Sequence, residues 1–105
     1  MSKGNVVEML KRIGLPFAYD HFAEGESPNP PFLVYLYPNA NNFSADGCVY
    51  HKSDRLHIEL YTDKKDVTLE EKVEETLNLF GFYYLKLETW IPSEKLYEVL
   101  YQTEV

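Results

Sequence analysis

Three histidines and one glutamate of this chain are the first residues to consider for a metal site. His21, His51 and His57 lie on three different predicted strands, and Glu59 shares a strand face with His57. A histidine–histidine–glutamate metal site can be drawn from them. The spacing, however, contains neither HxxxH nor HExxH, the motifs that place two histidines on one helix face. We therefore expect polar residues on a sheet face and no metal site.

Cys48 is the only cysteine, and it could act as a nucleophile with His51 or His57. A catalytic cysteine needs an electropositive setting that favours the thiolate, and this chain is acidic. The sequence contains no glycine-rich phosphate loop, no nucleophile-elbow serine and no calcium loop. We expect no catalytic residue, no metal and no cofactor, and hence a protein that is not an enzyme.

The composition is typical of one small acidic domain, which we assign to residues 1–105. Ten Lys+Arg against 17 Asp+Glu give a net charge of −7, which excludes phosphate neutralisation on nucleic acid as the main activity. No signal peptide and no membrane-spanning apolar run is visible, so we expect a protein that does not enter a membrane. Nine tyrosines, six phenylalanines and one tryptophan are many for this length. Tyrosine suits half-buried sheet faces, but we expect some of these rings to lie in an interface.

The elements that must position these residues follow from the hydrophobic pattern. It predicts an α+β domain in the order α-β-β-β-β-α-β-β, with a largely antiparallel sheet flanked by two helices that cover one face. The first helix is expected over 3–13, with Gly14 as its stop. The expected strands are 17–22, 32–37, 48–52, 55–62, 82–91 and 96–105.

The second helix carries the clearest local signals. Thr68 to Glu71 fits a capping box, in which the threonine hydroxyl and the glutamate each satisfy a free amide of the first turn. Gly81 is the expected stop. We expect the buried stripe to consist of Leu69, Val73, Leu77 and Phe80, and the outer face of Glu70, Glu71, Glu74 and Glu75.

Two surface regions are candidates for contact with other subunits or partners. One is the polar loop 39–47, and the other is the face of the 82–91 strand that carries aromatic rings, which we expect to point outward. Large aromatic residues dominate interface energies, so Trp90 is expected to have the larger effect. The candidate interface residues are Asn39, Asn41, Asn42, Asp46, Tyr84 and Trp90.

Nearly the whole chain carries a pattern of segments that resembles one protein family. The segments are Gly-Leu-Pro-Phe-Ala-Tyr-Asp-His-Phe (14–22), Pro-Pro-Phe-Leu-Val-Tyr-Leu (30–36), Asn-Asn-Phe-Ser-Ala-Asp (41–46), Val-Tyr-His-Lys (49–52), Ile-Glu-Leu-Tyr-Thr-Asp-Lys-Lys-Asp (58–66) and Leu-Tyr-Glu-Val-Leu-Tyr (96–101). With the acidic helix between the last two, this order is similar to the tail terminator, or tail-completion, proteins of long-tailed phages and prophages.

The resemblance implies an α+β fold and a structural role without cofactor or catalytic residue. Such proteins assemble as rings, often hexameric, at the head-proximal end of the tail tube, stop its polymerisation and join the tail to the head. The implied partners are other copies of the chain, the major tail tube protein and a head-completion or connector protein. DNA passes through without specific binding. The implied locations are the host cytoplasm during assembly and the head–tail junction of the virion.

A second hypothesis stays open beside the resemblance. The acidic charge also suits a small inhibitor or immunity-type module that covers a basic partner in a one-to-one complex. A third, an enzyme that uses His51, His57 and Cys48, is the least favoured. The mass of the protein in solution separates the first two hypotheses, since one predicts rings and the other does not.

Overall fold

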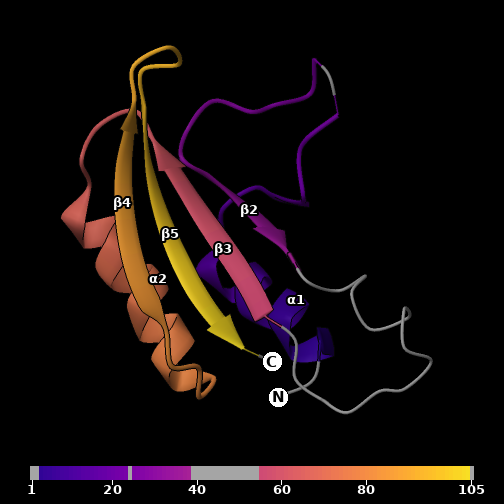
Figure 1. The fold of residues 1–105 in the computed structure, drawn as a ribbon. Coiled ribbons are helices and arrows are strands. Elements are labelled where there is room, and N and C mark those ends of the chain that lie inside the picture. The colour runs from indigo at the N-terminus through magenta and orange to yellow at the C-terminus, as the bar shows by residue number, and fades with distance from the viewer. Residues whose placement is uncertain (1–2, 24, 39–54, 105) are drawn as a thin grey trace.

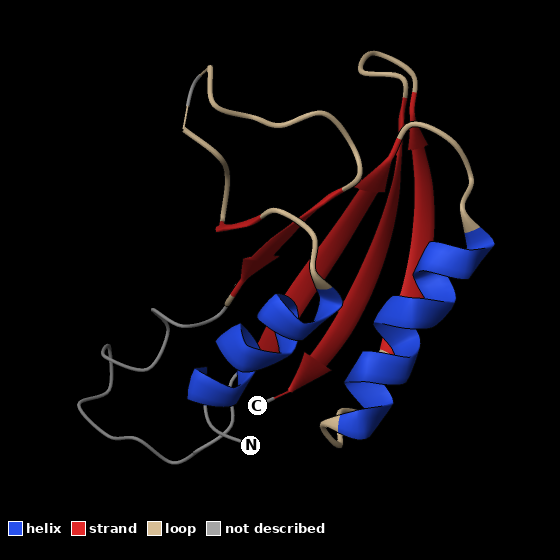
Figure 2. Ribbon diagram, turned by 180° about the vertical axis from the view of Figure 1, so that it is seen from behind, coloured by secondary structure: helices blue, strands red, loops and turns tan. Residues whose placement is uncertain are grey.

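The computed structural model describes residues 3–23, 25–38 and 55–104, which form two helices packed on one face of a five-stranded sheet (Figure 1, Figure 2). The α+β class is confirmed, and the described elements follow the expected order. The expected strand 48–52 lies outside the described residues. The elements are α1 (Lys3–Ile13), β1 (Phe17–Tyr19), β2 (Phe32–Leu36), β3 (Arg55–Thr62), α2 (Val67–Leu79), β4 (Leu85–Ile91) and β5 (Leu96–Glu104).

The sheet has the strand order β1-β2-β3-β5-β4. β1 runs parallel to β2, and the other three pairings are antiparallel, as expected for a largely antiparallel sheet. The chain leaves β3 through α2 and returns as the edge strand β4, so that β5 fills the place between β3 and β4 (Figure 1). The last strand is therefore held on both sides.

β1 is shorter than the expected strand 17–22. It ends because Asp20 has a positive φ of 65°, which is incompatible with extended backbone, while its N–H donates to the Tyr35 carbonyl at 2.7 Å. The chain then leaves the sheet as a loop that returns at Phe32.

The core lies between the two helices and the sheet face that they cover (Figure 2). Helix α1 stops at Gly14, as predicted. The φ of +88° at this position suits a residue without a Cβ. None of the helices that the structure describes is long and apolar enough to cross a membrane. The fully buried side chains are Val6, Met9, Leu10 and Ile13 of α1, Val73 and Leu77 of α2, and Leu33, Leu56, Ile58, Leu60, Val99 and Tyr101 of the sheet.

The start of α2 corrects the predicted capping box. The cap is Asp66, whose carboxylate accepts from the Leu69 N–H at 3.0 Å, and the helix begins at Val67. Aspartate caps a helix as well as threonine does, and its charge also favours the positive end of the helix. Thr68 is therefore an ordinary exposed residue of the first turn.

The end of α2 confirms Gly81 as the stop. The Phe82 N–H donates to the Leu77 carbonyl and the Gly81 N–H to the Asn78 carbonyl, both at 3.0 Å. This is a Schellman motif, and it requires the φ of +82° that Gly81 adopts. Phe82 and Leu77 are both buried in the core, so the turn also brings the chain back to the core.

Candidate functional site

The two faces of the edge strand β4 are turned the opposite way from our expectation. Lys86 pairs with Tyr101 and Glu88 with Val99, both core residues of β5, so these charged residues share the face that the helices cover. Directly opposed residues of antiparallel strands point to the same side. Leu85 and Leu87 therefore point to the other side, which no described helix covers and which we call the open face.

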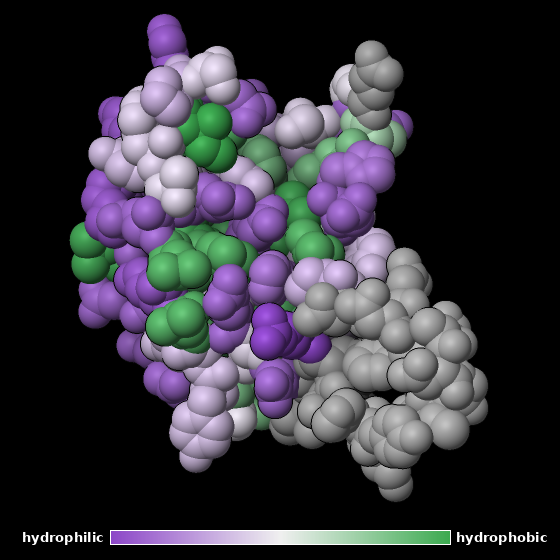
Figure 3. All heavy atoms as spheres, in the orientation of Figure 1, coloured by the Kyte–Doolittle hydropathy of each residue, from purple (hydrophilic) through white to green (hydrophobic). Residues whose placement is uncertain are grey.

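The open face carries apolar side chains from β4 and β5. Leu85 is 59% exposed and Leu87 46%, although leucines of a sheet usually face its core. On the same face, Leu100 of β5 lies directly opposite Leu87 and is half-buried. Figure 3 shows this side of the molecule, where apolar areas lie among hydrophilic ones. The open face is thus a surface suited to contact with another protein.

A group of charged side chains fills the space between α2 and β4. Glu70 is only 3% exposed and pairs with Lys65 and Lys86, each at 2.8 Å. Lys86 also reaches Glu74 at 2.7 Å, and Lys65 reaches Glu88. Glu70 and Glu74 were expected on the outer face of α2, and that prediction is wrong for both, since each pairs with Lys86 of β4.

The charge state of this group follows from its contacts. Burial alone would raise the pKa of Glu70, but the hydrogen bonds and charges of Lys65 and Lys86 outweigh burial and lower it. Burial likewise opposes the charge of Lys86, and its contacts with Glu70 and Glu74 raise its pKa nevertheless. Glu70 and Lys86 are therefore ionised near neutral pH, and their ion pair links α2 to β4.

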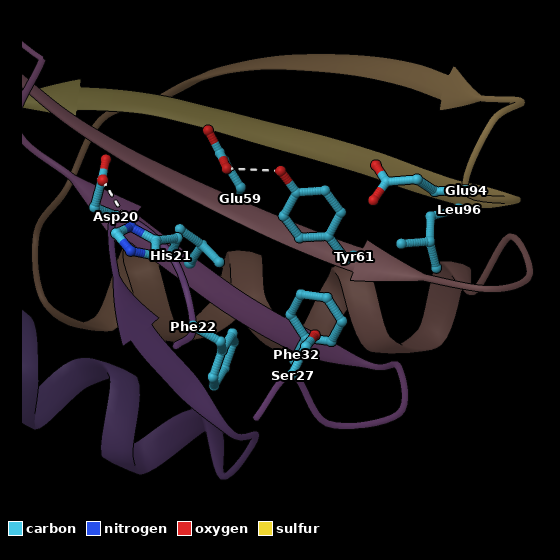
Figure 4. Close-up of a pocket in the computed structure, with 10 residues that line it drawn as sticks. Asp20, His21, Phe22, Ser27, Phe32, Glu59, Tyr61, Glu94 and Leu96 are labelled. Atoms are coloured by element: carbon cyan, nitrogen blue, oxygen red, sulfur yellow. Dashed lines mark hydrogen bonds and ion pairs between the residues drawn. The ribbon is translucent and has the colours of Figure 1, made fainter. Parts of the chain in front are cut away.

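A groove of about 220 Å³ opens on the open face between the loop that follows β1 and strands β2, β3 and β5 (Figure 4). The loop supplies one side of it, and the sheet supplies the other. Its lining residues are Asp20, His21, Phe22, Ser27, Phe32, Val34, Glu59, Tyr61, Glu94 and Leu96.

Tyr61 stands between two carboxylates at this groove. Its hydroxyl lies 2.8 Å from a Glu59 oxygen and 2.9 Å from a Glu98 oxygen. Burial raises the pKa of Glu59, the Tyr61 hydrogen bond opposes that rise, and the charges of Glu98 and Asp20 add to it. The two carboxylates are thus held close together with one hydroxyl proton between them.

The two histidines that the structure describes lie on different elements of the fold. His21 is exposed and pairs with the neighbouring Asp20 at 2.9 Å, whereas His57 lies on β3, where burial and the charge of Arg55 lower its pKa. Cys48 and His51 lie outside the described residues. Within the described residues, no group of three His, Cys, Asp or Glu side chains could hold a metal ion.

The predicted interface residues divide into two sets. Tyr84 and Trp90 do not point outward from the sheet as expected. Tyr84 is half-buried with its ring edge-on to Tyr101 at 5.3 Å, and Trp90 pairs with Tyr97 at 4.7 Å on the side of the helices, where it remains 44% exposed. Their interface role stays a prediction. The other set, Asn39, Asn41, Asn42 and Asp46, lies outside the described residues.

The sequence reasoning missed both the groove and the group around Glu70. The alternation of 55–62 puts Glu59 and Tyr61 on one face of a strand, and that of 96–105 sets Glu98 apart from the apolar residues. Only the β3–β5 register, which sets Tyr61 opposite Glu98, brings the three together. For Glu70 no signal was available, because four glutamates on one helix are typical of a solvated face.

Comparison with known proteins adds nothing to the resemblance found in the sequence. No protein-family model and no curated protein matches this chain, so the tail terminator family stays a prediction for it.

Proposed function

We propose that this chain is a phage structural protein that caps the head-proximal end of the tail tube, stops its polymerisation and joins tail to head. The observation that carries the proposal is the open face, a sheet surface with exposed leucines on an edge strand. A protein that works by surface contact needs such an area, and the α+β fold agrees with the fold that the resemblance implies. The role needs no catalytic residue and no cofactor.

The proposed working form is a ring. A ring requires that one surface of a subunit meets a different surface of the next subunit. The open face with Leu85 and Leu87 is one such surface, and the exposed part of Trp90 lies on the opposite side of the same strand. The partners in this proposal are other copies of the chain, the major tail tube protein and a head-completion or connector protein. Its places are the host cytoplasm during assembly and the head–tail junction of the virion, where DNA passes without specific binding.

The test is the assembly of tail tubes in the presence of the purified protein, imaged by negative stain. Wild-type protein should yield tubes of one length that are capped at one end. Leu87→Glu places a charge on the open face and should leave tubes longer or uncapped. Val67→Glu is the matched control, because Val67 is 56% exposed on α2 and a glutamate suits the first turn of a helix.

The outcomes separate the possibilities. If wild-type protein neither binds tube ends nor limits tube length, the proposed function is wrong. If Leu87→Glu and Val67→Glu both cap tubes like the wild type, the open face is not the working surface. Trp90→Ala then tests the other side of β4.

A second candidate function is a small acidic module that covers a basic partner in a one-to-one complex. The observation that favours it is the groove, where Asp20, Glu59 and Glu94 line a concave surface of a protein whose net charge is −7. Such a module would show no ring in mass measurements, with or without tail tubes.

A further inference from the structure

The groove on the open face has aromatic walls. The Phe32 ring stacks on the Tyr61 ring with centroids 5.2 Å apart and 27° between their planes, and the Phe22 ring meets Phe32 edge-on at 5.4 Å. Figure 4 shows these rings facing the cavity from the loop, β2 and β3. The groove, with a volume of about 220 Å³, has room for one long side chain.

The charges at the groove are unbalanced. Asp20, Glu59 and Glu94 line it, Glu98 approaches from β5, and no lysine or arginine is among its described lining residues. The one basic side chain among these lining residues, His21, is exposed and already pairs with Asp20.

The hydroxyl of Tyr61 cannot satisfy both of its carboxylate neighbours. It carries one proton, which it donates to either Glu59 or Glu98 at a time, yet it lies within 2.9 Å of both. The carboxylate that does not receive this proton is left for a further donor, from solvent or from a cationic group of a partner. The site is therefore prepared for one more donor beside the aromatic rings.

We propose that this groove binds an arginine side chain of a partner protein. A guanidinium is planar, stacks on aromatic faces and presents several N–H donors at once, so it can serve Glu59 and Glu98 together while its plane lies along the rings. A lysine ammonium is a point donor and lacks the flat surface. The proposal goes beyond tube capping, since it describes a pocket of the protein alone and holds for either candidate function.

The test is an NMR titration of the whole ¹⁵N,¹³C-labelled protein at low salt with N-acetyl-arginine amide. N-acetyl-citrulline amide, which has nearly the same shape and no charge, is the control ligand. Arginine should cause saturable shifts confined to signals of the groove, those of Phe32, Glu59 and Tyr61 among them. Citrulline and N-acetyl-lysine amide should bind at least about tenfold more weakly, a factor that corresponds to 1.4 kcal/mol.

Two variants locate the binding. Glu98→Gln removes one negative charge while keeping an acceptor for Tyr61, and it should weaken arginine binding about tenfold, the effect of one charge-assisted hydrogen bond. Glu75→Gln removes the same charge from the exposed side of α2 and should leave the affinity unchanged. The dispersion of each variant's spectrum reports whether it is folded, and Glu59→Gln replaces Glu98→Gln if the latter is not.

Several results would overturn the proposal. They are shifts that do not saturate up to about 100 mM ligand, equal binding of citrulline or lysine, and equal weakening by the Glu75 and Glu98 variants. Any of these leaves tube capping untouched, because that experiment uses neither the ligand nor these variants.

Discussion

Replacing Glu70 by glutamine tests whether the charged group between α2 and β4 holds the two elements together. Glu70 is 3% exposed and accepts from Lys65 and Lys86 at 2.8 Å each. Glutamine has the same shape but no charge, so the change removes the electrostatic part of both contacts and little of the packing.

The expected loss is about 2 kcal/mol. Hydrogen bonds to charged groups contribute roughly 1.5–3 kcal/mol each. Lys65 and Lys86 keep their contacts with Glu88 and Glu74, and their side chains are 40% and 37% exposed, so remaining carboxylates and water offset part of the loss. In a domain of this size, 2 kcal/mol corresponds to a fall of about 10 °C in Tm.

Urea denaturation followed by far-UV circular dichroism measures the difference directly. Glu71→Gln is the matched control, because Glu71 is exposed on the same helix and should change stability by no more than about 0.5 kcal/mol. Equal shifts for the two variants would refute the structural role of Glu70.

The pH dependence of this effect has a defined sign. The folded protein lowers the pKa of Glu70, so its ionised form adds stability above the ordinary glutamate pKa of about 4.3. That stability is lost as the pH falls below this value towards the folded pKa. The difference between wild type and Glu70→Gln should therefore be full at pH 7 and shrink below about pH 4.

Four further substitutions have expected outcomes. Leu77→Ala should cost about 2–5 kcal/mol in urea denaturation, because Leu77 is fully buried. Leu79→Ala should cost less than about 0.5 kcal/mol, because Leu79 is 62% exposed, and a reversed order would mean that α2 packs with another face. Gly81→Ala should lower stability by about 1–2 kcal/mol, since an alanine is strained at a φ of +82°, and an unchanged midpoint would contradict that strain. The folded protein raises the pKa of Glu59, so the wild type should gain stability relative to Glu59→Gln as the pH falls from neutral towards the ordinary glutamate pKa, and a gap that is constant with pH would contradict the shift.

The sequence predicted those elements whose local signals agree with their packing. α1 has its apolar stripe and its glycine stop, and β3 and β5 alternate cleanly along their length, so period and face were both readable. The prediction for α2 was right at its stop, Gly81, and wrong at its cap, because both Asp66 and Thr68 are residues that cap helices.

The errors arose where the sequence pattern separates two faces of an element but does not show which of them points to the core. In β4 the alternation is clear, and the usual rule puts the apolar face on the core and the charged face in solvent. Here the order is reversed, because α2 presents Glu70 and Glu74 to the charged face of that strand. To predict the carboxylate pair at the groove, one must know that Tyr61 lies opposite Glu98, 37 residues away in the chain. Such pairing between distant strands is a property of the whole sheet.

The charged face of β4 is turned towards the helices, and this orientation helps to select one strand register. Sliding β4 by one residue along β5 would turn Leu85 and Leu87 towards α2 and the charged side chains towards water. Both leucines are already about half-buried, so that alternative would gain for each only about half of the roughly 1.5–3 kcal/mol that full burial of a leucine contributes. The slip, however, takes Lys86 away from Glu70 and leaves a buried carboxylate with Lys65 alone. The ion pairs of this strand thus specify which of two competing alignments is native, a task that hydrophobic residues perform in most sheets.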